Sequence, residues 1–303
     1  MQQLLGAGAV GLVGGESLFG ADKTAPEAFR FAFLTDLHLM PDLGLRSAQG
    51  IAACLAEVEK LQPRPDFILV GGDLVHRARD LTIPQAETAL DLFLKIWREN
   101  TSLPAHWTFG NHDLAGTSNH EVDALDPLYG KGLFKERLHL PELYYGFAHR
   151  GWRFLVLDDI ALQANHSYVG ELFNDELAFA KTSLAAHTSA PTIIGTHIPL
   201  ISNLPLTLHL LKSSSPEPNN LVCGNSGQLT KLFPGHNVRA VLCGHLHHYE
   251  KLEIDGIPFV NSGAVCGSYW KGAMYGCPEG FGVVDVGADG SVAFDYRNYG
   301  WKA

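Results

Sequence analysis

Apolar and polar positions in the first half of the chain alternate between short apolar runs and longer amphipathic stretches. Residues 31–35, 66–70 and 105–109 are apolar, β-prone runs, which predict strands. Between them, apolar residues recur at helical spacing over residues 47–61 and 84–99, which predicts two helices. This alternation is typical of βαβ units, so we expect a largely parallel sheet here.

The second half has a similar pattern with more antiparallel character. Residues 144–148 and 153–157 predict a hairpin, and residues 174–187 predict a helix. Two further strands are expected at 191–195 and 238–243, followed by short strands to the end of the chain. Residues 204–226 are rich in Ser, Pro and Asn, so we expect a long loop over a site. The fold class expected from this order is mixed α/β.

Composition narrows the class of protein. With 46% apolar and 18% charged residues, the chain is expected to be globular rather than disordered. A net charge of −10 gives no general attraction to nucleic-acid phosphates or anionic lipid. The 15 histidines of this acidic chain suggest metal ligation or proton transfer.

Cysteines and the N-terminus leave the compartment open. The chain has five cysteines and no CxxC pair; buried free thiols are expected at Cys54 and Cys243, and a disulfide among the last few is an alternative. Residues 1–28 are either a remnant export signal, which would favour an exported or periplasmic protein, or a glycine-rich arm of a cytoplasmic one. Residues 29–303 are expected to form a single domain without a membrane span.

Polar residues follow the predicted strands at five places. In open α/β sheets the carboxyl ends of strands converge on a crevice, so these side chains are expected to form one site. They offer oxygen and nitrogen donors, which suit Mn, Fe or Zn. The candidates are Asp36, His38, Asp73, Asn111, His112, Asp113, His197, His245 and His247.

In sequence these residues form the blocks D-x-H, G-D, G-N-H-D, T-H and G-H-x-H, in that order. The set resembles the calcineurin-like metallophosphoesterases, and among them it is most similar to the bacterial phosphodiesterase and purple-acid-phosphatase-like members. The resemblance implies a four-layer αββα sandwich, in which helices flank two mixed β-sheets. It also implies a phosphohydrolase that cleaves phosphodiester or phosphomonoester bonds with two divalent or trivalent metal ions.

The resemblance assigns the site residues to two metals and to catalysis. Asp36, His38, Asp73 and His247 would hold the first ion, and Asp73, Asn111, His197 and His245 the second. A hydroxide bridging the metals would attack the phosphate, and His112 would assist the leaving group with its imidazole oriented by Asp113. His76, three residues after Asp73, is expected to form a hydrogen bond near the first metal rather than to bind it.

Two alternatives remain at this point, a metal-binding scaffold without catalysis and a nuclease. The intact donor set argues against the scaffold, and the acidic charge does not encourage the nuclease, so a small phosphorylated substrate is expected. Residues 204–226 and 261–276 are the segments expected to select it. Tyr269 and Trp270, in the second segment, could line a pocket or cover the core.

Overall fold

The computed structural model describes residues 25–40, 46–212 and 220–303. Most of the N-terminal segment 1–28, with its two interpretations, lies outside the described residues. None of the helices in the described part of the chain combines the length and hydropathy that a membrane span requires.

One sheet has five strands in the order β13-β12-β1-β2-β3. β1, β2 and β3 are parallel neighbours, whereas β12 runs antiparallel to both β1 and β13. The strands are β1 (Phe29–Leu34), β2 (Ile68–Val70), β3 (Ala105–Trp107), β12 (Gly280–Val286) and β13 (Val292–Asn298). The first and nearly the last strands of the chain therefore lie side by side.

The second sheet has six strands in the order β10-β11-β9-β8-β5-β4. β5, β8, β9 and β11 are parallel, and the outer strands β4 and β10 are antiparallel to their neighbours. The strands are β4 (Tyr145–His149), β5 (Trp152–Val156), β8 (Thr192–Gly195), β9 (Val238–Cys243), β10 (Glu250–Ile254) and β11 (Ile257–Asn261). A separate hairpin pairs β6 (Ile160–Leu162) with β7 (Tyr168–Gly170).

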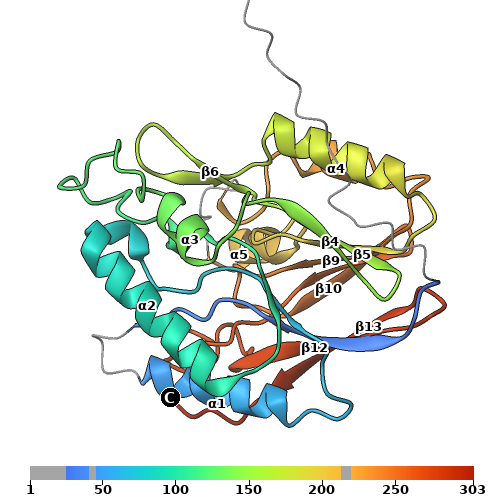
Figure 1. The fold of residues 1–303 in the computed structure, drawn as a ribbon, viewed down its shortest axis with the longest axis horizontal. Coiled ribbons are helices and arrows are strands. Elements are labelled where there is room, and N and C mark those ends of the chain that lie inside the picture. The colour runs from blue at the N-terminus through green and yellow to red at the C-terminus, as the bar shows by residue number, and fades with distance from the viewer. Residues whose placement is uncertain (1–24, 41–45, 213–219) are drawn as a thin grey trace, which may run out of the picture.

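Helices cover the outer sides of the two sheets. Figure 1 shows α4 on one side, α1 on the other, and the two sheets between them, with α2 beside α1. The helices are α1 (Ser47–Glu59), α2 (Ile83–Asn100), α3 (Gly132–Arg137), α4 (Asn174–Ala186), α5 (Leu204–Lys212) and α6 (Ser226–Thr230). This is the predicted αββα arrangement.

Strand β1 is buried on both faces, and its successive side chains belong to two different apolar layers. Phe31 and Phe33 point into the layer between the sheets, where Phe31 stacks on Phe67 at 5.0 Å between ring centroids and meets the edge of Phe154 at 5.5 Å. Ala32 belongs to the core cluster that includes the helices. Because successive side chains of a strand point to opposite faces, a strand between two apolar layers is apolar throughout.

The sequence prediction was wrong for part of one segment. The loop expected over residues 204–226 begins with helix α5 and ends at the first residue of α6, while residues 213–219 lie outside the described residues. Helix α5 forms because Leu204 and Leu208, one turn apart, pack against Leu246. All five cysteines are buried and free, so the buried thiols are confirmed and a disulfide is not formed.

Candidate active site

Five parallel strands end at one place in the fold and carry the predicted site residues there. β1, β2 and β3 are followed by Asp36 and His38, by Asp73, and by a 3₁₀ turn at Asn111–Asp113. In the other sheet, the neighbours β8 and β9 are followed by His197 and by His245 and His247. The carboxyl ends of both sheets thus meet, as expected for parallel strands.

Asp73 lies at the centre of the site. Its Oδ2 atom is 3.3 Å from Nε2 of His38 and 3.5 Å from Nε2 of His197. Its Oδ1 atom accepts the backbone N–H of His112 at 2.8 Å, which fixes the orientation of the carboxylate. One oxygen of Asp73 is therefore placed between two imidazoles, as a carboxylate shared by two cations would be.

The first group of donors surrounds Asp36 and His38. Nε2 of His247 is 3.3 Å from Oδ1 of Asp36 and 3.1 Å from Nε2 of His38. The other carboxylate oxygen of Asp36, Oδ2, accepts hydrogen bonds from the Thr35 hydroxyl at 2.8 Å and from the His245 N–H at 2.9 Å. Oδ1 is buried without a hydrogen-bond partner, which is costly unless a cation binds it.

The second group lies on the other side of Asp73. Oδ1 of Asn111 is 3.0 Å from Nε2 of His197, and donor atoms of Asp73, His197 and His245 lie within 4.8 Å of one another. His245 contacts the carbonyl oxygen of Asn220 through Nε2 at 2.5 Å, so its Nδ1 is the atom left to bind a metal. All seven predicted ligands are thus brought together in two groups that share Asp73.

Backbone carbonyls orient two of the histidines. Nδ1 of His197 lies 2.7 Å from the oxygen of Gly71, and Nδ1 of His247 lies 2.5 Å from the oxygen of Gly267. Because a carbonyl only accepts, Nδ1 carries a proton in both rings, and Nε2 is the nitrogen that faces the site and would bind a metal. Asp159 accepts the backbone N–H of His197 through Oδ1 at 3.2 Å and holds this loop in place.

The buried carboxylates stabilise positive charge at this site. Burial opposes the charged imidazolium, yet Asp73 raises the pKa of His197 to about 10. For His38 burial dominates and lowers the pKa well below its ordinary value. A set of buried carboxylates and imidazoles with an unpaired Asp36 oxygen has the chemistry of a metal-ion site.

The ligand loops have an unusual backbone conformation. Five of the predicted ligands have positive φ, with values of 55° for Asp36, 42° for His38, 56° for Asp73, 73° for His245 and 51° for His247. Residues with a side chain rarely adopt this left-handed region, and it concentrates at functional sites. The packed strands before each residue hold the loops in this shape.

His112 lies beside the ligands with a defined tautomer. Its ring centroid is 4.6 Å from that of His38, and its Nδ1 atom accepts the backbone N–H of Arg77 at 3.0 Å. In the neutral ring, the proton is therefore on Nε2. Burial lowers the pKa of His112, which favours this neutral form.

Asp113 has a different position from the one predicted. Its carboxylate accepts backbone N–H groups, with Oδ1 bound to Leu74 at 2.9 Å and Val75 at 3.3 Å, and Oδ2 bound to Asp73 at 2.9 Å and Gly110 at 3.0 Å. Burial and the nearby Asp73 raise the pKa of Asp113, but a protonated oxygen would face N–H donors, so the geometry fits the charged form. In place of the expected contact with the His112 ring, Asp113 ties the loop after β2 to the loop after β3.

Three further residues contact the site. His76 places Nδ1 3.3 Å from Nδ1 of His38, and its ring stacks on His112 at 5.0 Å. Tyr269, left open between pocket and core, lies 4.9 Å from His38 and 4.7 Å from His247, measured between ring centroids. The Cys266 thiol is 3.7 Å from Nδ1 of His247, a contact that no motif indicates.

The chain is similar in sequence and in fold to known proteins. Residues 29–249 match the model of a family described as Calcineurin-like phosphoesterase. A 3',5'-cyclic adenosine monophosphate phosphodiesterase of Haemophilus influenzae is 24% identical, covering 87% of this chain and 88% of its own. Tartrate-resistant acid phosphatase type 5 of Sus scrofa is 27% identical, covering 89% and 80%. The crystal structure of a dimetal phosphatase from Danio rerio superposes with a TM-score of 0.62 at 13% identity, covering 89% and 96%, so it has the same fold.

Proposed function

Since the chain belongs to the calcineurin-like phosphoesterase family, we propose that it is a dinuclear metal-dependent hydrolase of small phosphoesters. The observation that carries the proposal is the position of Asp73 Oδ2, 3.3 Å from His38 and 3.5 Å from His197, between two complete groups of donors. Asp36, His38, Asp73 and His247 would hold one cation. Asp73, Asn111, His197 and His245 would hold the other.

Two bound cations would supply polarisation of the phosphate and a bound water of lowered pKa. The chain itself supplies the fixed geometry, because carbonyls of Gly71 and Gly267 orient two ligand imidazoles before substrate arrives. With the Arg77 N–H on Nδ1, the Nε2–H of His112 is free to donate a proton or hydrogen bond to the leaving oxygen. This assignment needs no oriented carboxylate behind His112.

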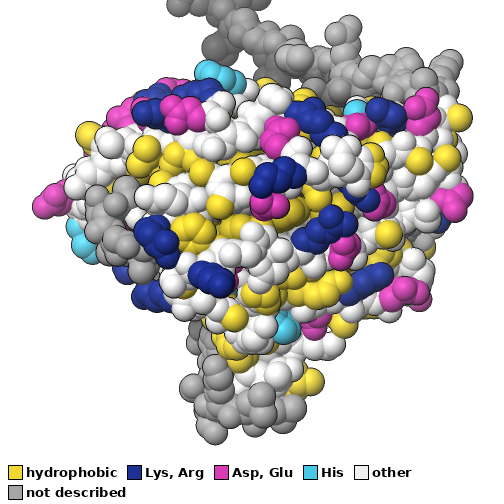
Figure 2. All heavy atoms as spheres, turned by 90° about the horizontal axis from the view of Figure 1, so that it is seen from below, with side chains coloured by type: hydrophobic (Ala, Val, Ile, Leu, Met, Phe, Trp, Pro, Cys, Tyr) yellow, Lys and Arg dark blue, Asp and Glu magenta, His cyan; other side chains and the backbone are white. Residues whose placement is uncertain are grey.

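Small substrates are favoured over long nucleic acids. On the face in Figure 2, Lys and Arg side chains lie interspersed with Asp and Glu side chains rather than gathered into a basic stripe. The chain also carries 32 acidic against 22 basic residues. A nuclease would require neutralisation of many phosphates along a groove, with steep salt dependence. Phosphodiesters are the first substrates to test, because one relative is named a 3',5'-cyclic adenosine monophosphate phosphodiesterase, and monoesters follow from the acid phosphatase.

The test is metal analysis combined with chromogenic assays. The protein is stripped with a chelator, reconstituted with Mn, Fe, Zn or Co, and assayed with bis(4-nitrophenyl) phosphate and 4-nitrophenyl phosphate. We expect about two metals per chain and hydrolysis of at least one ester, with both lost in Asp73→Ala. An inert wild type with every metal, or a fully active Asp73→Ala, would refute the proposal, and the first result would favour the scaffold.

A further inference from the structure

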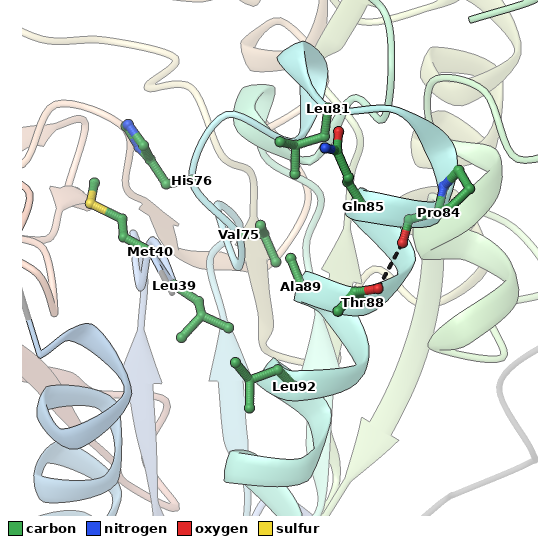
Figure 3. Close-up of a pocket in the computed structure, with 10 residues that line it drawn as sticks. All are labelled: Leu39, Met40, Val75, His76, Leu81, Pro84, Gln85, Thr88, Ala89 and Leu92. Atoms are coloured by element: carbon green, nitrogen blue, oxygen red, sulfur yellow. Dashed lines mark hydrogen bonds between the residues drawn. The ribbon is translucent and has the colours of Figure 1, made fainter. Parts of the chain in front are cut away.

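An apolar groove of about 490 Å³ runs along helix α2 next to the metal-ligand cluster. Its floor is formed by Leu39 and Val75, from the loops after β1 and β2, and its wall by Leu92 and other residues of α2 (Figure 3). In the part of the chain that the structure describes, none of its ten lining residues is Asp, Glu, Lys or Arg. The volume lies in the range of about 300–1,000 Å³ that is usual for sites of small molecules.

His76 connects this groove to the proposed active site. It lines one end of the groove, where Figure 3 places it beside Met40 and apart from the residues of α2. The same imidazole stacks on His112 at 5.0 Å between centroids and lies 3.3 Å from His38 through Nδ1. A group that leaves the site past His112 and His76 therefore enters the groove.

We propose that the groove binds an apolar substituent, alkyl or aryl, of a phosphoester whose phosphate is held at the ligand cluster. The inference rests on the proposed function and specifies its substrate class. Between Gln85 and Leu92 the groove follows about 10 Å of helix, long enough for several methylene groups. Water on a concave apolar wall is released when an apolar group binds, which makes this part of the substrate a source of affinity.

A polar substituent such as a sugar fits this groove less well. Apart from His76, the polar side chains that line it are Gln85 and Thr88. The Thr88 hydroxyl already donates to the Pro84 carbonyl at 2.8 Å, as the dashed line in Figure 3 marks. A substituent with several hydroxyl groups would lose hydrogen bonds to water that these partners could not replace.

A series of n-alkylphosphonates from methyl to octyl tests the proposal, because each has one anionic head and one apolar arm. The inhibition constant against a chromogenic ester should fall about two- to fourfold for each added methylene until the groove is filled. Direct binding to the metal-loaded protein by calorimetry should give the same slope. A series that is flat with chain length, or no binding at any length, would overturn the proposal.

A matched pair of variants locates the effect. Thr88→Trp fills the groove from an exposed position of α2 and should abolish most of the dependence on chain length. Thr182→Trp is the control, since Thr182 is an exposed helical threonine of α4 that donates to the carbonyl four residues earlier at 2.9 Å, as Thr88 does. Thr182→Trp should keep the wild-type slope, and an unchanged slope in Thr88→Trp would refute the assignment.

The two proposals fail in different ways. If the wild type hydrolyses esters but shows a flat phosphonate series, only the groove is misassigned. If the wild type hydrolyses nothing, the proposed function fails, and the calorimetric series still decides whether the groove binds apolar arms.

Discussion

Replacing Asp113 by Asn distinguishes two roles for this residue, holding two loops together and orienting the His112 ring. The amide offers one accepting oxygen where the carboxylate offers two, and each carboxylate oxygen accepts two buried backbone N–H groups. Two of these N–H groups would therefore face an NH₂ group. A buried donor without a partner costs about 1–3 kcal/mol, so Asp113→Asn should lower the free energy of unfolding by about 2–6 kcal/mol.

The same substitution should weaken metal binding. Asp113 bonds the backbone of Asp73 and of Gly110, which precedes Asn111, so its loss loosens two ligands at once. We expect metal affinity to fall about 10- to 100-fold, the usual effect of removing a residue that orients ligands. Differential scanning calorimetry of the apoprotein should show a melting temperature lowered by about 3–9 °C. Metal affinity is measured by competition with a chromogenic chelator.

His112→Ala is the comparison that makes the result decisive. This variant should keep its metals, because His112 is not a proposed ligand, while kcat falls about 10²- to 10⁴-fold with the loss of proton donation to the leaving oxygen. Its melting temperature should fall less than that of Asp113→Asn, because His112 accepts one backbone N–H, from Arg77, where Asp113 accepts four. If Asp113 acted through the His112 ring, Asp113→Asn would resemble His112→Ala. An Asp113→Asn protein with wild-type stability and metal affinity but a low kcat would therefore refute the structural role.

Two other substitutions test packing and ionisation. In Gly244→Ala the new Cβ would lie 1.9 Å from the Thr35 hydroxyl, so the free energy of unfolding should fall by about 1–3 kcal/mol and metal affinity should fall with it. Gly227→Ala is the control, because a Cβ there meets open space, and this variant should be neutral or stabilising in thermal melts. Burial raises the pKa of Glu176 to about 9, with a further contribution from the charge of Asp158. Because the unfolded chain loses this proton at a lower pH than the folded chain, the free energy of unfolding declines from about pH 4.5 to pH 9. Between pH 5 and pH 8, the free energy of unfolding of Glu176→Gln should rise by up to about 4 kcal/mol relative to that of wild type, as measured in urea melts of the apoprotein. A difference between the two proteins that is equal at both pH values would contradict the shifted pKa.

The convergence of the proposed ligands could be predicted from sequence because it depends on local order along the chain. A strand pattern followed by a donor places that donor at the carboxyl end of the strand, and parallel pairing of β1, β2 and β3 then brings Asp36, Asp73 and Asn111 together. The positive φ values at Asp36 and Asp73 were not predictable, since nothing in the residue type favours them enough. They arise because the site requires the side chains to converge.

The role of Asp113 could not be predicted for a different reason. Its partners Leu74 and Val75 lie about forty residues earlier, and their N–H groups meet its carboxylate only after two loops have docked. Sequence adjacency suggested instead that Asp113 serves His112. The apolar groove was missed for the same reason, because it forms only when α2 packs against the loops after β1 and β2. The segments expected to select the substrate were instead 204–226 and 261–276.

Helix α5 shows how one leucine pattern can favour two structures. Leu204, Leu206 and Leu208 alternate with other residues, which suits a strand, yet Leu204 and Leu208 are also one helical turn apart. Contact with Leu246 selects the helix, because Leu246, between the proposed ligands His245 and His247, packs against both Leu204 and Leu208. As a consequence, Leu206 turns away and is left 60% exposed. Because α5 packs on the residue between two proposed ligands, its helical form supports the geometry of the proposed metal site.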